Sequence, residues 1–369
     1  MVQKSPHPPA VGRDERAIAL WLLACAAMIA AMVVLGGITR LTESGLSITE
    51  WQPITGALPP LSEAAWQEEF AKYQQISQFQ LMHSWMTLDD FKTIFFWEWL
   101  HRLWGRLIGV VFALPFLWFL LRRRVSLMLA PRLAGILVLG GLQGALGWFM
   151  VKSGLTERVE VSQYRLVAHL GLAVIIYAAI LKTALGLLWP TPLRALGAPP
   201  GLRRAAGLLV GLVFLTLLAG GFVAGLNAGL TYNTFPLMDG RFVPEGYLQL
   251  SPWWRNWFEN VASVQFDHRI LAMTTAASVV AVWGASWRVL LPPRSRWAVH
   301  ALLAAVLLQF GLGVSTLLLA VPIPLGVAHQ AGALLLFTAA LVAHHALREA
   351  PRPMAAPVAQ LDEPGAALL

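Results

Sequence analysis

The chain has 369 residues, of which 57% are hydrophobic and only 12% are charged. Soluble domains usually carry about 25% charged residues, so the composition excludes an ordinary soluble enzyme and indicates a polytopic membrane protein. The formal net charge of +8 does not indicate a nucleic-acid partner, because the arginines cluster at the ends of apolar segments, where they act as topology signals.

Eight apolar segments are long enough to cross a bilayer, which takes about 20 residues, and lipid requires them to be helical. The predicted spans are residues 18–38, 97–121, 133–151, 166–188, 204–224, 267–291, 298–320 and 325–346. Residues 1–17 are predicted to form a cytoplasmic tail. Residues 348–369, which are rich in Pro and Ala, are predicted to form a disordered cytoplasmic tail. The long outer loop 39–92 contains an amphipathic stretch, Leu61–Gln75, which can lie on the membrane surface or cap the first bundle.

The basic residues set the direction of these spans. Lys and Arg gather in both tails and in the loops after the second, fourth and sixth spans, whereas most acids lie in the opposite loops. Both termini are therefore expected on the cytoplasmic side. The second, fourth, sixth and eighth spans then run inward, and each opens with a histidine, so four imidazoles share one depth near the outer face: His101, His169, His268 and His329.

The two halves of the chain repeat one another. Four features of the first half recur in the second: Gly36-Gly37 as Gly220-Gly221, His101 as His268, Gln143 as Gln309, and His169 as His329. Four spans followed by four spans in the same direction predict an all-α fold of two tandem four-helix bundles. A pseudo-two-fold axis along the membrane normal relates them. The predicted halves are residues 18–195 and 196–347.

Paired imidazoles on facing helices can bind one iron from both sides. Each half offers only two histidines, and the single cysteine, Cys25, lies inside the first span. This donor set suits haem better than zinc, and an apolar bundle accommodates a large apolar ring. The predicted metal ligands are therefore His101 with His169 in the first half, and His268 with His329 in the second.

Five arginines on the outer side oppose the positive-inside bias, and one of them, Arg165, lies at an outer helix end. Arg102 and Arg269 each follow a predicted ligand, Arg106 lies one turn beyond Arg102, and Arg40 lies at an outer helix end. Haem propionates would give these cations a partner. The alternative is a structural ion pair with Asp or Glu in the loops.

The halves differ at one position that bears on chemistry. Glu98 precedes His101 by three residues, on the same helix face, whereas the second half has Gln265 at the matching place. A carboxylate beside a macrocycle can move protons, so the first half is expected to perform the chemistry and the second to carry electrons. The alternative is that Glu98 orients a ligand or pairs with Arg102.

Several of these motifs together resemble the haem A synthase family. They are Gly36–Thr42, Ser44–Ser47, Trp51-Gln52-Pro53, Glu98–Arg102, Asp267-His268-Arg269 and Ala328-His329-Gln330, and the resemblance covers roughly residues 18–346. The outer-loop motifs are specific, whereas paired histidines alone are not. The chain lacks the outer-loop cysteine pairs of one bacterial branch, so it is similar to the mitochondrial-type branch that proteobacteria share.

The resemblance implies a membrane oxidoreductase that oxidises the C8 methyl of haem O to a formyl, giving haem A for terminal oxidase assembly. His101 and His169 would flank the substrate haem with Glu98 as catalytic acid, and His268 and His329 would bind a haem b cofactor. Partners would include membrane lipid, a haem O synthase (farnesyltransferase), terminal oxidase assembly factors, and a ferredoxin-type or quinol electron donor. The location would be the bacterial inner membrane, with the haem sites near the periplasmic side. Homo-oligomer formation is left open.

Two other functions fit part of the pattern. A quinol-linked dihaem electron carrier explains the four histidines but gives no reason for Glu98 to lack a counterpart. A transporter built from parallel repeats explains the duplication, but predicts a colourless protein.

Overall fold

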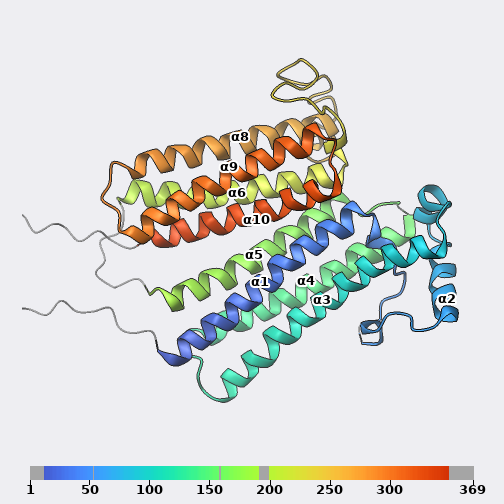
Figure 1. Cartoon of the computed structure of the whole chain (residues 1–369), viewed down its shortest axis with the longest axis horizontal. Coiled ribbons are helices and arrows are strands. Elements are labelled where there is room, and N and C mark those ends of the chain that lie inside the picture. The colour runs from blue at the N-terminus through green and yellow to red at the C-terminus, as the bar shows by residue number, and fades with distance from the viewer. Residues whose placement is uncertain (1–11, 53, 158, 191–198, 349–369) are drawn as a thin grey trace, which may run out of the picture.

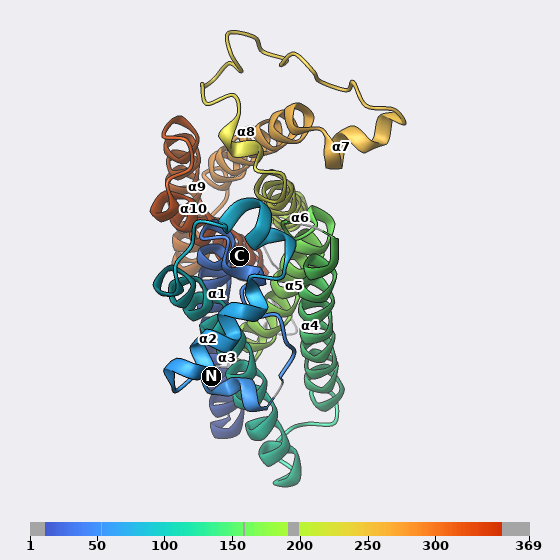
Figure 2. The ribbon, with the colours of Figure 1, turned by 90° about the vertical axis from the view of Figure 1, so that its right-hand side faces the viewer.

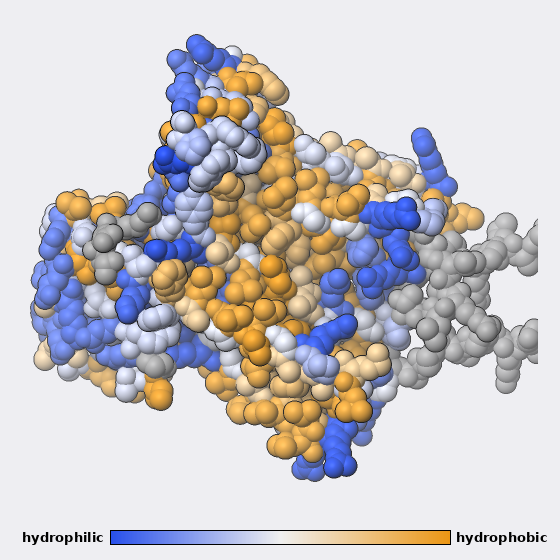
Figure 3. All heavy atoms as spheres, turned by 180° about the vertical axis from the view of Figure 1, so that it is seen from behind, coloured by the Kyte–Doolittle hydropathy of each residue, from blue (hydrophilic) through white to orange (hydrophobic). Residues whose placement is uncertain are grey.

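The computed structural model describes residues 12–52, 54–157, 159–190 and 199–348. Within these residues the fold is all-helical, without a named strand, and eight helices are long and apolar enough to cross a membrane. They are α1 (Arg13–Leu41), α3 (Leu88–Leu121), α4 (Ala130–Glu157), α5 (Gln163–Leu188), α6 (Pro200–Gly225), α8 (Val261–Ser286), α9 (Pro293–Leu318) and α10 (Ile323–Ala346). Figure 3 shows hydrophobic residues over the middle of the molecule and hydrophilic ones toward its ends.

The helices begin where the sequence satisfies their free backbone N–H groups. Thr87 caps α3 in a capping box with Asp90, and the Asn260 side chain caps α8. A proline stands in the first turn of each of α6, α9 and α10, where its missing N–H costs nothing. The capping of α3 explains why this helix starts earlier than the predicted residue 97.

One predicted span is displaced. The sixth span was expected over 267–291, but α8 runs from Val261 to Ser286. The chain turns after Ser286 because α9 already starts at Pro293, and Pro292 and Pro293 cannot continue a preceding helix. Most of the predicted tail 348–369, and residues 1–11 of the predicted tail 1–17, lie outside the described residues.

The helices fall into two groups with matching neighbours (Figure 1). In the first group α1 contacts α3 and α5, and α4 contacts α3 and α5; in the second, α6 contacts α8 and α10, and α9 contacts α8 and α10. The groups meet where α1 packs on α10, α5 on α6, and α5 on α10. These contacts are consistent with the predicted duplication.

A small cap covers the loop end of the first group, seen end-on in Figure 2. Helix α2 (Glu63–Tyr73) is the core of the predicted amphipathic stretch, and it packs on α3. Its Trp66, Phe70 and Tyr73 contact Phe91 and Phe95 of α3. Of the two roles expected for this stretch, the structure therefore shows the cap.

Candidate functional site

The four predicted ligand histidines lie on four different helices at one end of the molecule. His101 is on α3, His169 on α5, His268 on α8 and His329 on α10, and each ring is partly buried. The last three lie about two turns after the start of their helices. His101 and His169 are close enough to interact electrostatically, and so are His268 and His329. The structure therefore brings the predicted ligands together as the predicted pairs.

Each of these imidazoles packs against a glycine of a neighbouring helix. A methyl group added to the glycine would lie close to Cε1 of the ring: 3.7 Å for Gly36 and His101, 3.0 Å for Gly147 and His169, 3.0 Å for Gly220 and His268, and 2.8 Å for Gly313 and His329. Carbon atoms in ordinary contact are about 3.5–4.0 Å apart, so a side chain at three of the four glycines would displace the ring. The missing side chains of Gly147, Gly220 and Gly313 thus define three seats for imidazole rings, whereas Gly36 is in ordinary contact with His101.

Two glutamines make the same contact in both halves. Nε2 of Gln143 on α4 lies 3.2 Å from Nδ1 of His169, and Nε2 of Gln309 on α9 lies 3.1 Å from Nδ1 of His329. The two Oε1 atoms are buried and have no hydrogen-bond partner among the described residues. At Gln309, amide oxygen and nitrogen are nearly interchangeable in shape, so Oε1 could face the ring of His329 and accept from Nδ1–H. Such a bond leaves Nε2 of a histidine available to a metal. Gln143 differs, because its Nε2 also donates to the His169 carbonyl at 3.0 Å, which keeps the amide nitrogen toward the histidine.

Glu98 is buried, and its carboxylate is fully engaged. One oxygen accepts hydrogen bonds from Ser47 Oγ at 2.7 Å and from the backbone N–H of Ile48 at 2.8 Å. The other accepts from Arg102, at 3.1 Å from Nε and 2.6 Å from Nη2. Arg102 also donates to the carbonyls of Ile48 and Glu50. This pair fastens the chain after α1 to the helix that carries His101.

The second half repeats this clamp with a neutral side chain. Arg269 donates to the carbonyls of Tyr232 and Thr234, at 2.5 and 2.8 Å. Gln265 donates to the carbonyls of Ala228 and Thr231, where Glu98 instead accepts from its loop. Arg102 and Arg269 thus each donate to two backbone carbonyls. Nε of the buried Arg269 makes no hydrogen bond among the described residues.

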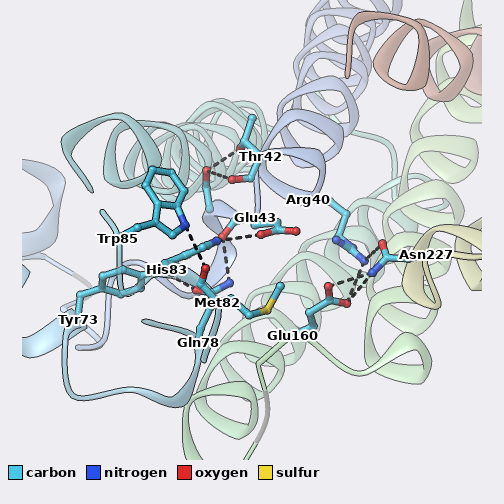
Figure 4. A network of polar contacts seen from close by, with 11 residues as sticks. Arg40, Thr42, Glu43, Tyr73, Gln78, Met82, His83, Trp85, Glu160 and Asn227 are labelled. Carbon is cyan, nitrogen blue, oxygen red and sulfur yellow. Dashed lines mark hydrogen bonds and ion pairs between the residues drawn. The ribbon is translucent and has the colours of Figure 1, made fainter. Parts of the chain in front are cut away.

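Two other predicted propionate partners lie in different surroundings. Arg106 donates to the carbonyl of Gln52 at 2.9 Å. Arg40 forms an ion pair with Glu160 at 3.3 Å, and it donates to Ala224 O and Asn227 Oδ1 at the end of α6 (Figure 4). Arg40 therefore joins the two halves, and its contacts match the structural ion pair that the sequence left as the alternative.

A second polar cluster lies beside Arg40, and sequence reasoning did not assemble it (Figure 4). His83 contacts Tyr73 Oη through Nδ1 at 2.7 Å and Glu43 through Nε2 at 2.9 Å, and Gln78 donates to the Glu43 carbonyl. Burial, and then the charges of Glu43 and Glu98, raise the pKa of the Tyr73 phenol, so it remains a hydrogen-bond donor. This cluster fastens the cap to the end of α1.

No group of three or more His, Cys, Asp or Glu side chains within the described residues could hold a bare metal ion. The fold and the site define a polytopic helical membrane protein with two pairs of histidines, an arrangement typical of membrane haem proteins. The family model COX15-CtaA, described as cytochrome oxidase assembly protein, matches residues 19–341. The chain belongs to this family.

Curated relatives match over nearly the whole chain. The chain is 56% identical to a heme A synthase of Rhodospirillum centenum over 91% of its own length and 90% of the relative. It is 54% identical to a heme A synthase of Nitrosospira multiformis, over 90% and 94% of the two chains. A heme A synthase of Parvibaculum lavamentivorans is 52% identical, over 90% and 95%.

Proposed function

We propose that this protein is a haem A synthase, a membrane oxidoreductase that converts haem O to haem A by oxidising the C8 methyl to a formyl group. The observation that carries the proposal is the two pairs of histidines, with glycine seats for three of the rings, in a chain about half identical to relatives named heme A synthase.

The residues present fit the haem groups that this activity requires. We assign His101 and His169 to the substrate haem, and His268 and His329 to a haem b cofactor. The fit is supported by three ring seats that a Cβ would fill, and by the buried oxygen of Gln309, which can fix the tautomer of His329. When bound, the haem groups supply the redox chemistry.

The chain's own residues position these groups. Gln143 and Gln309 orient their histidines. Arg269 can offer Nε to a propionate, whereas the predicted partners Arg102, Arg106 and Arg40 have the loop contacts described above. Glu98 holds Arg102 and the chain at Ser47 and Ile48 beside His101. As the one carboxylate in this position, Glu98 is also our candidate acid for holding or moving a proton near the substrate.

We further propose the placement in the cell. The protein would span the bacterial inner membrane with both termini in the cytoplasm, because the basic residues follow that direction. The substrate-binding half would comprise residues 18–195 and the haem b half residues 196–347. Haem O synthase and oxidase assembly factors would be its neighbours, and a ferredoxin-type protein or a quinol its electron donor.

Extraction of bound pigments from the purified protein tests the proposal. Haem B recovered together with haem O or haem A supports it. Haem B alone, at two per chain, would instead favour the dihaem electron carrier, and a colourless preparation from haem-replete cells would favour a transporter.

For Glu98→Ala we expect haem b to be retained and haem A production to be lost. Unchanged production would remove Glu98 from the chemistry.

A further inference from the structure

The two double glycines each lie between a histidine of their own half and the histidine-bearing helix of the other half. In α1, Gly36 faces His101, and a methyl on Gly37 would lie 2.8 Å from Oε1 of Gln330 on α10. In α6, Gly220 faces His268, and a methyl on Gly221 would lie 3.0 Å from Cγ2 of Val167 on α5. Both junctions therefore place a histidine-bearing helix of one half against the helix whose glycine contacts a histidine of the other half.

Within the described residues, only the first of these two junctions contains a hydrogen bond between the halves. The hydrogen bonds of Arg40 to Ala224 and Asn227 join α1 to the end of α6, outside both junctions. Nε2 of Gln330 donates to the carbonyl of Val33, one turn before Gly37, at 2.7 Å. The residue that follows His169, as Gln330 follows His329, is Leu170, and it offers only an apolar contact to Gly221. The duplicated halves thus differ at this point.

We propose that Gln330 is the residue that couples the two sites electronically, through its hydrogen bond to Val33 of α1. Gln330 is bonded directly to His329, and Val33 lies in the helix whose Gly36 contacts His101. Electron tunnelling weakens less along covalent and hydrogen bonds than across van der Waals gaps, so this junction is the better route. Gly37 has no side chain because the Gln330 amide occupies that space.

The inference rests on the proposed function, in which the C-terminal half supplies electrons. Gln330 would pass one electron at a time from the site of His268 and His329, which is oxidised, to the site of His101 and His169, which is reduced. No bond forms or breaks at Gln330, and no proton is transferred there.

Gln330→Leu tests the inference, because it removes the amide that bonds to Val33. It also introduces leucine, the residue that follows His169 at the other junction. The matched control is Thr338→Val, which removes another hydrogen bond between the halves, from Tyr177 Oη to Thr338 Oγ1 at 2.8 Å. Thr338 lies nine residues after His329 on the same helix, about 13 Å along its axis. Each variant therefore loses one such bond, and only Gln330→Leu loses the bond near the histidines.

The measurement is electron redistribution in purified protein that carries both pigments. A light pulse with a photoreductant injects less than one electron per protein, and absorbance at the separate bands of haem B and haem A follows the approach to equilibrium. We expect Gln330→Leu to slow this relaxation severalfold with unchanged pigment content and spectra, and Thr338→Val to leave it unchanged.

Gly37→Ala gives a second variant if Gln330→Leu does not accumulate, since its methyl would push the amide away while keeping the glutamine. It should also slow redistribution. Wild-type relaxation in Gln330→Leu, or equal slowing in Thr338→Val, would overturn the inference. Wild-type protein with haem B alone would instead defeat the proposed function on which the inference depends.

Discussion

Gly313→Ala is the substitution for which the structure predicts the sharpest effect. The new methyl would lie 2.8 Å from Cε1 of His329, whereas carbon atoms normally keep about 3.5–4.0 Å apart. The ring must therefore move by about 1 Å. Because both glycine and ring belong to packed transmembrane helices, neither side can yield freely.

The size of the effect follows from the energetics of overpacking. An inserted methyl in a packed interior costs about 1–3 kcal/mol, and about 1.4 kcal/mol corresponds to a tenfold change in affinity. If the displaced ring binds iron, affinity of the C-terminal half for haem b should fall about 5- to 150-fold.

Titration of the purified, haem-depleted protein with haem B measures this affinity through the absorbance of the bound pigment. Gly311→Ala is the matched control, because it adds the same methyl to the same helix where no atom lies within 4 Å. Equal affinity in the two variants would refute the assignment of Gly313 as the seat of a ligand.

Three further predictions concern other parts of the molecule. Glu98→Gln should lower stability by about 3–5 kcal/mol, because it breaks a buried ion pair with Arg102; an unchanged thermal unfolding temperature would contradict this. His268→Ala should abolish haem b absorbance, and loss of only the substrate pigment would reverse our assignment of the halves. Hydrogen bonds from Arg255 and then Tyr164 lower the pKa of Glu259. The stability that these hydrogen bonds contribute is therefore fully present above the ordinary glutamate pKa of about 4.3. It is lost as the pH falls through the lowered pKa of Glu259. Protection factors for hydrogen exchange in α7 (Asn256–Glu259), which correct for the intrinsic pH dependence of exchange, should fall in acid, but should not fall in Glu259→Gln.

The sequence by itself determined the eight transmembrane helices and the pairing of the histidines. Both follow from local patterns, since a bilayer demands apolar helices of a fixed length and the arginines predict their direction. The match of Gln143 with Gln309 was also visible in the sequence, and the structure shows both amides beside their histidines. The roles assigned to the four histidines and to Glu98 stay predictions that pigment extraction and substitution can test.

Only the tertiary structure decided which partner each polar side chain takes. From its position in the sequence, Arg40 could pair either with a haem propionate or with an acidic side chain. In the folded protein it contacts Glu160 and Asn227, which are far from it in the sequence. The cap likewise depends on contacts between α2 and α3 that hydrophobicity alone cannot distinguish from contact with lipid. The sequence does not show which side chain packs against a glycine. Only the packing of neighbouring helices shows that the His169 ring lies against Gly147 and the His329 ring against Gly313.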